Sequence, residues 1–168
     1  SRRRASTPHH RGAPLPLDDL ECALQKTAEA LRCADALLIC TGAGMGVDCG
    51  LGTYRGRRAG VWGPLRALCL SYEQISDPDY FESDPRLAWA YWGSTLRGYS
   101  QAEPHAGYHL LRKWGERLPH GLFSVTTNID GHWLRVLAAE SVFECHGSVM
   151  HLQRVDGTGD VWSMPEAD

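Results

Sequence analysis

The stretch Ala-Leu-Leu-Ile-Cys-Thr-Gly-Ala-Gly, residues 36–44, joins a short apolar run directly to a glycine turn. A continuous apolar run of this length predicts a strand buried on both faces, as in a parallel sheet. Glycines at the end of such a strand let the backbone turn tightly and approach a ligand closely. Gly42, Ala43 and Gly44 are therefore candidate cofactor-binding residues, and a plain turn between strand and helix explains the pattern equally well.

Two more strand patterns follow along the chain. Residues 121–126 and 142–144 are apolar runs that predict further strands. Leu38 and Ile39 are expected to lie beside Phe123 and Val125, on adjacent buried strands of one parallel sheet. Right-handed crossovers would then place the turn after each strand at the same edge of the sheet.

Helical patterns separate these strands. Asp18 and Glu21 resemble a capping box that opens a first helix, and apolar residues then recur at helical spacing as far as Leu31. A second amphipathic helix is predicted over 105–118, with its buried side formed by Leu110, Leu111, Trp114 and Leu118, and a third over 131–140. The alternation predicts an α/β fold with a Rossmann-like, doubly wound parallel sheet.

The 168 residues provide one domain with a real core. We expect residues 1–17 to form a disordered basic tail, since residues 1–16 hold four arginines and no acid; a remnant of a targeting segment is the alternative. The domain proper would cover 18–168. Within it, the tryptophan-, tyrosine- and proline-rich stretch of about 57–103 is expected to be an inserted module of short helices and loops.

Composition excludes several classes of function. A net charge of −3 gives no reason to expect direct binding to nucleic acid, and no apolar run is long enough to cross a membrane. None of the six cysteines forms a CxxC pair, so neither a structural zinc site nor a redox motif is expected. Reduced cysteines in an intracellular protein are the simplest interpretation.

Polar residues stand at the ends of the second and third predicted strands. Asn128 offers a donor and an acceptor and Asp130 offers acceptors, which suits an amide-bearing ligand in the crevice beside a parallel sheet. Capping of the next helix is the alternative role for both residues. His146 directly follows the third strand, where a histidine can act as a general base, although a lone histidine is more often structural.

Together these motifs resemble one family. Residues 42–56, GAGMGVDCGLGTYRG, resemble the sirtuin signature GAGxSxxxGIPDFRG; residues 126–130, TTNID, resemble TQNID; and residues 144–148, ECHGS, resemble ExHGS. Residues 104–109 stand where the family has a P-N-x-x-H helix start. Order and spacing agree from Leu20 to Gln153. Sirtuins are NAD-dependent protein-lysine deacylases.

The resemblance implies a role for each motif. Gly42, Ala43, Gly44 and Arg55 would line the NAD phosphates and the loop over the cofactor, and Thr127 would belong to the same site. Asn128 would position the nicotinamide ribose, and Asp130 would hold the nicotinamide carboxamide. His146 would be the base that activates a ribose hydroxyl, so that the acyl group of an acylated lysine on a protein substrate can migrate and be hydrolysed.

The chain also departs from the family pattern. Gly46 replaces the signature serine, Gly52 and Thr53 replace Pro-Asp, and Thr127 replaces a glutamine. After Asp130 the chain reads Gly-His-Trp instead of Gly-Leu-His, and Arg154 stands about where the first zinc cysteine is expected. Two alternatives to a deacylase therefore stay open: a catalytically degenerate NAD-binding module, and an NAD glycohydrolase or ADP-ribosyltransferase.

Overall fold

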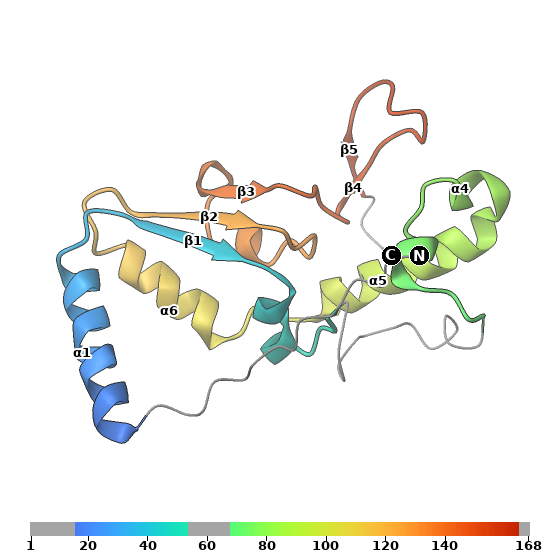
Figure 1. Cartoon of the computed structure of the whole chain (residues 1–168). Helices are drawn as coiled ribbons and strands as arrows, with labels where there is room; N and C mark the ends of the chain where they lie inside the picture. The colour runs from blue at the N-terminus through green and yellow to red at the C-terminus, as the bar shows by residue number, and fades with distance from the viewer. Residues whose placement is uncertain (1–15, 54–67, 165–168) are drawn as a thin grey trace, which may run out of the picture. The chain divides into compact units, whose positions relative to one another are not determined.

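The computed structural model describes residues 16–53 and 68–164 (Figure 1). Most of the expected basic tail, the first part of the expected inserted module, and the candidate cofactor residue Arg55 lie outside these ranges. The chain divides into two compact units, residues 1–34 and 35–168. No helix in the described part of the chain is both long enough and apolar enough to cross a membrane.

The first unit contains one helix, α1 (Leu17–Arg32). It begins one residue before the predicted start, and Pro16 is its N-cap without a side-chain hydrogen bond, so the predicted capping box does not form. Asp18 and Asp19 instead lie in the first turn, where a carboxylate is stabilised by the helix dipole.

The second unit is built on a three-stranded parallel sheet in the order β1 (Leu37–Thr41), β2 (Leu122–Thr126) and β3 (Val142–Glu144). Leu38 pairs with Phe123, which confirms that the first two apolar runs are adjacent strands, and Val125 pairs with Phe143. The prediction of a Rossmann-like α/β sheet is thus confirmed in its strands and their direction.

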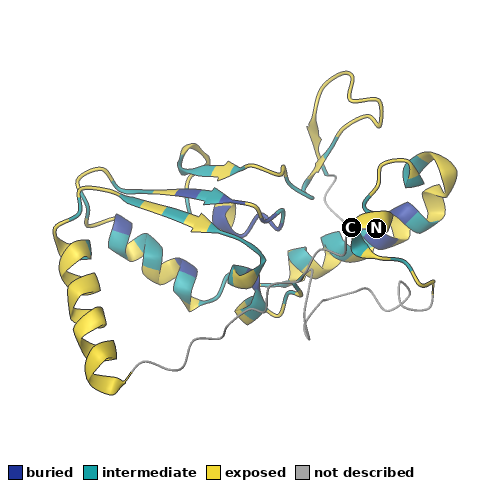
Figure 2. Ribbon diagram, in the orientation of Figure 1, coloured by how far each residue is buried: buried dark blue, intermediate teal, exposed yellow. Residues whose placement is uncertain are grey.

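Within the part of the chain that the structure describes, only one face of this sheet is covered, which corrects the prediction of strands buried on both faces. Ser124 and Thr126 are buried, whereas Leu38 is 64% exposed and Phe143 is 55% exposed. Figure 2 shows buried, intermediate and exposed residues mixed along these strands. Because side chains alternate along a strand, residues one place apart face opposite sides of the sheet. The apolar runs therefore supply one inner face and one outer apolar face.

The core lies on the inner face of the sheet. Tyr108, Trp133 and Val136 form a buried cluster, and Ile39 of β1 and Leu122 of β2 pack against it. Tyr108 comes from α6 (Ala106–Gly115), the shorter form of the helix predicted over 105–118. Among the residues expected on its buried side, Leu110 is 47% exposed, because α6 turns Tyr108 and Gly115 inward.

The segment after β2 is not the α-helix predicted over 131–140. It forms two short 3₁₀ helices, η2 (Trp133–Arg135) and η3 (Ala139–Ser141). Gly131 takes the left-handed φ of 71°, and the Asp130 carboxylate accepts the His132 N–H, so the chain turns before a helix can start. Trp133 and Val136 have helical spacing because both are drawn into the core.

The described part of the predicted helical module is helical. It contains α3 (Tyr72–Ile75), α4 (Tyr80–Ser83) and α5 (Pro85–Gln101), and the last of these is far longer than the short helices expected. Asp84 caps α5 by accepting the Leu87 N–H, and proline occupies the first turn. Ile75 and Tyr91 form a second buried cluster, with Trp92 packed against it.

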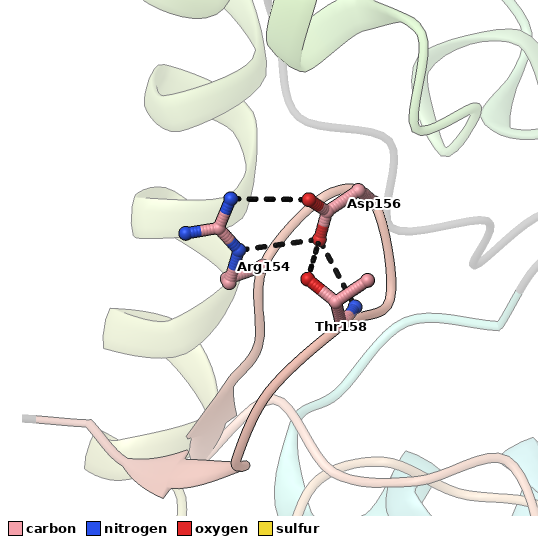
Figure 3. Close-up of polar contacts among 3 residues, drawn as sticks. All are labelled: Arg154, Asp156 and Thr158. Atoms are coloured by element: carbon pink, nitrogen blue, oxygen red, sulfur yellow. Dashed lines mark hydrogen bonds and ion pairs between the residues drawn. The ribbon is translucent and has the colours of Figure 1, made fainter.

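A small antiparallel hairpin, which the sequence patterns did not predict, follows β3. Its strands are β4 (His151–Leu152) and β5 (Trp162–Ser163). In the loop between them, Arg154 and Thr158 both bond to the Asp156 carboxylate (Figure 3). These bonds lower the pKa of Asp156 to about 2, the contact with Arg154 contributing most.

Candidate functional site

The loops after β1 and β2 meet at one edge of the sheet. Thr41 pairs with Thr126, and the Thr127 N–H donates to the Thr41 carbonyl at 3.1 Å. A Cβ on Gly42 would lie 3.2 Å from the Thr127 hydroxyl oxygen, so this position favours glycine. The prediction that the glycine turn and the Asn128 loop lie at the same sheet edge is confirmed.

The glycine turn leads into η1 (Ala43–Cys49), a 3₁₀ helix of seven residues. His105, the N-cap of α6, fastens η1 in position. Its Nε2 bonds to the Met45 carbonyl at 3.1 Å, and its Nδ1 accepts the Gly107 N–H at 2.9 Å. The neutral ring with its proton on Nε2 satisfies both contacts.

A small cavity lies between η1 and the Asn128 loop. Its volume is about 20 Å³, room for about one water molecule. The residues that line it are Ala43, Gly46, Leu51, Gly52, Tyr99, Asn128, Ile129 and Asp130. A Cβ on Gly46 would lie only 3.1 Å from Leu51 Cδ1, which shows how closely Leu51 fills this space. An aromatic ring could enter only if Leu51 moved aside.

Asn128 and Asp130 bring buried polar groups to this cavity. Both are 6% exposed. The Asn128 side-chain amide nitrogen has no hydrogen-bond partner within the described structure, and an unused buried donor is costly unless a ligand or water meets it. Asp130 accepts the His132 N–H through one oxygen at 3.0 Å, so it does stabilise the following turn, as the alternative interpretation expected.

Tyr99 lines the same cavity and was not a candidate from the sequence. It lies on α5, nearly thirty residues before Asn128. Burial raises the pKa of Tyr99 to about 12, and the Tyr72 hydroxyl and the Asp130 charge add to the effect. Its hydroxyl therefore keeps its proton at neutral pH and can donate a hydrogen bond. One tyrosine within a helical pattern gives no signal of a distant partner, so only the fold identifies it.

His146 follows β3 and lies beside the start of the Asn128 loop. The ring is exposed, and its Nδ1 is 3.2 Å from the Thr127 carbonyl oxygen. A carbonyl can only accept, so Nδ1 donates, and the neutral ring keeps a free lone pair on Nε2. That is the tautomer that a general base requires.

Two larger cavities adjoin His146. One of about 460 Å³ is also lined by Glu144, His151 and Val161, and one of about 340 Å³ is also lined by Ile129. Ile129 borders the small cavity as well, so the Asn128–Asp130 cavity and the cavity of about 340 Å³ beside His146 share this lining residue. Burial raises the pKa of Glu144, and the negative charge of Asp130 adds to the effect.

The candidate residues thus fall into three groups. Ala43, Asn128 and Asp130 line one cavity, and His146 faces the two neighbouring cavities. Gly42 and Gly44 lie in the adjoining turn, where Gly44 is exposed. Within the described residues, no cluster of three or more histidine, cysteine or acidic side chains could hold a metal ion.

A parallel α/β sheet with polar residues at the carboxyl ends of its strands is typical of α/β proteins that bind a ligand in the crevice at that edge. The family model that matches is that of the Sir2 family, over residues 42–161. The chain belongs to the Sir2 family.

Two curated relatives are similar over most of this chain. An NAD-dependent protein deacylase of Deinococcus radiodurans is 30% identical over 86% of this chain and 58% of its own length. An NAD-dependent protein deacylase 2 of Pseudomonas aeruginosa is 31% identical over 80% of this chain and 52% of its own length. The chain therefore spans about half the length of these curated relatives.

Solved structures agree on the fold. A complex of a Sir2 homologue with NAD has a TM-score of 0.68 at 22% identity, and covers 93% of this chain and 54% of that chain. A complex of a mutant Sir2 homologue with ADP-ribose has a TM-score of 0.69 at 22% identity, and covers 86% of this chain and 54% of that chain. The sheet, α6 and the helical module thus have the arrangement of a Sir2 protein.

Proposed function

We propose that this chain provides the nicotinamide-binding and base-bearing part of an NAD-dependent protein-lysine deacylase. The observation that carries the proposal is the arrangement around the Asn128 loop. A buried amide donor and a buried carboxylate line one cavity, and a histidine with a free Nε2 lines the two larger cavities. Membership of the Sir2 family and the names of the curated relatives support the same activity.

The polar groups present suit NAD. When bound, NAD supplies an activated ribose carbon to which an acyl oxygen can add as nicotinamide leaves. Asp130 has acceptor atoms for the N–H groups of the carboxamide, and the unused amide of Asn128 can donate to a ribose oxygen. Tyr99 is a further protonated donor at the same cavity. Leu51 must shift to admit the ring, since the cavity holds about one water molecule.

His146 is proposed to accept a proton from a ribose hydroxyl at Nε2. The Thr127 carbonyl holds the opposite nitrogen, so the ring is oriented before any ligand arrives. General-base catalysis typically contributes roughly 10²–10⁴ in rate. Arg55 is proposed to act at the cofactor phosphates and lies outside the described residues. The acylated lysine of a protein substrate is the proposed partner, with no role for nucleic acid or a membrane.

The test is nicotinamide release from NAD with and without an acetyl-lysine peptide. We expect multiple-turnover release that depends on the peptide and is lost in His146→Ala, while His109→Ala, an exposed histidine on α6, keeps turning over. Asp130→Asn replaces an acceptor with a donor and should raise the KM for NAD. Release without peptide would identify a glycohydrolase. NAD binding without release would identify a degenerate binding module, and the absence of both would refute the proposal.

A further inference from the structure

The cavity of about 340 Å³ beside His146 has an aromatic wall. This wall consists of Phe81, Trp89 and Trp92, from α4 and α5. Leu152 and Val155, from the hairpin, also line the cavity. An apolar cavity of this volume, with few polar groups, is typical of a site for a small apolar ligand.

The aromatic wall is held in place before any ligand binds. Phe81 and Trp89 meet edge to face with ring centroids 5.1 Å apart. Trp92 packs on the buried ring of Tyr91 at 5.2 Å, in the second core cluster. Such aromatic pairs are stabilising beyond their buried area. The side chains of the wall are therefore already ordered, and a ligand that binds there loses little free energy in ordering them. Trp89 nevertheless keeps 49% of its surface exposed and available for contact.

The size of the cavity exceeds what an acetyl group would fill. About ten water molecules occupy 340 Å³ in the liquid, whereas an acetyl group has three heavy atoms. If the acyl carbonyl lay near His146, an acetyl methyl would leave most of the aromatic wall unused. A longer chain that continues from the same carbonyl would cover it.

The charge at the edge of the cavity argues against an acidic acyl group. Arg154 lines the cavity, but its guanidinium is engaged by Asp156, with Nε at 3.3 Å from one carboxylate oxygen and an Nη at 3.1 Å from the other (Figure 3). Apart from this arginine, the cationic candidates among the described lining residues are His146 and His151. Asp156 thus offsets the charge of Arg154 and occupies two of its three guanidinium nitrogens, so a succinyl carboxylate would meet an arginine that is already paired.

We propose that this cavity binds the acyl chain of the modified lysine and selects long, uncharged apolar acyl groups over acetyl and succinyl groups. The inference rests on the proposed function for the position of the carbonyl near His146. It goes further by naming the substrate class and the residues that choose it: the aromatic wall of Phe81, Trp89 and Trp92, and the Arg154–Asp156 pair.

The experiment measures binding of one fluorescein-labelled lysine peptide by fluorescence anisotropy, with acetyl, hexanoyl, decanoyl or succinyl on the lysine. Each buried methylene can tighten Kd by up to roughly fourfold. We expect hexanoyl to bind at least about tenfold tighter than acetyl, decanoyl to bind at least as tightly as hexanoyl, and succinyl to bind no better than acetyl. Equal affinity across the series would overturn the proposal.

Variants locate the effect. Trp89→Ala should remove most of the gain from acetyl to decanoyl. The control Phe143→Ala, which removes an aromatic ring 55% exposed on the outer face of the sheet, should preserve the gain. Asp156→Asn frees the Arg154 guanidinium and should improve succinyl binding relative to acetyl. A gain that survives Trp89→Ala would place the acyl chain elsewhere and contradict the assignment.

Nicotinamide release separates this inference from the proposed function. Binding that depends on acyl chain length, without any release of nicotinamide, would support the proposed acyl site and refute the proposed deacylase activity. Release of nicotinamide at the same kcat/KM with acetyl and decanoyl peptides would support the proposed deacylase activity and refute the proposed preference for long acyl groups.

Discussion

At the scale of single residues, His105 shows how one side chain secures the loop that borders the candidate site. Its ring joins α6 to η1 through the Gly107 N–H and the Met45 carbonyl. The ring also meets buried Tyr108 edge to face, with centroids 5.0 Å apart. A Cβ on Gly107 would lie 2.5 Å from His105 Cε1, so the ring fits this place only because residue 107 is glycine.

We expect His105→Ala to lower the free energy of unfolding by about 2 kcal/mol, the sum of an N-cap and one further hydrogen bond. His105→Asn should recover roughly half of this loss, because asparagine caps well but is too short to reach Met45. Asp84→Ala, which removes only the cap of α5, is the matched control and should cost about 1 kcal/mol. Urea unfolding measures all three. Full recovery of stability in His105→Asn would exclude a role for the Met45 contact, and equal losses in both His105 variants would exclude a role for the cap.

At the scale of elements, the packing of α6 on β2 depends on Gly115. A Cβ there would lie 2.4 Å from Leu122 Cβ and 3.2 Å from the Leu122 backbone nitrogen. Gly115→Ala should therefore destabilise the protein by about 1–3 kcal/mol through overpacking. Gly98→Ala on α5, where nothing lies within 4 Å, should instead stabilise it by about 0.5–1 kcal/mol. Thermal unfolding of both variants decides, and shifts in the same direction would contradict this account of the interface.

The hairpin gives a prediction for pH. Asp156 has a pKa of about 2 in the folded chain, below its ordinary value of 3.8. A lowered pKa means that the carboxylate stabilises the folded hairpin fully above pH 3.8, and that this stabilisation is lost as the pH falls through about 2. The NMR shift of the Thr158 N–H, which donates to Asp156, should titrate with a midpoint near 2. A midpoint near the ordinary value would show that the Arg154 contact does not form in solution.

The elements also show what sequence patterns can and cannot predict. The three strands, their parallel direction, the adjacency of the first two and the shared edge of the loops that follow those two are predicted from apolar runs joined to turns, and all are observed. The exposed outer face could not be inferred, because Leu38 and Phe143 are as apolar as the residues facing the core. The mistaken helix after Asp130 arose because Trp133 and Val136 have helical spacing for a tertiary reason. Tyr99 reaches the site through helix packing, which leaves no local pattern.

At the scale of the whole molecule, the chain is expected to fold without a structural metal. Arg154 stands about where the family pattern has a zinc cysteine, and its bonds to Asp156 close the hairpin loop instead. We predict that elemental analysis of the purified chain finds no stoichiometric zinc, and that a chelator leaves its unfolding temperature unchanged. A full equivalent of tightly bound zinc, or a fall in that temperature with chelator, would contradict the prediction.

The register of the sheet has a consequence for how the chain reaches its native state. Leu37 pairs with Leu122, half the chain away, whereas Ser124 pairs with Val142 only a short segment later. Closing a long loop costs more entropy than closing a short one, and non-local pairing slows folding. One continuous stretch of the chain contributes β2, β3 and the cluster of Tyr108 and Trp133. We therefore expect these parts to assemble first. β1 and the glycine turn then join last, and the edge on which the candidate site is built is completed only in the final step of folding.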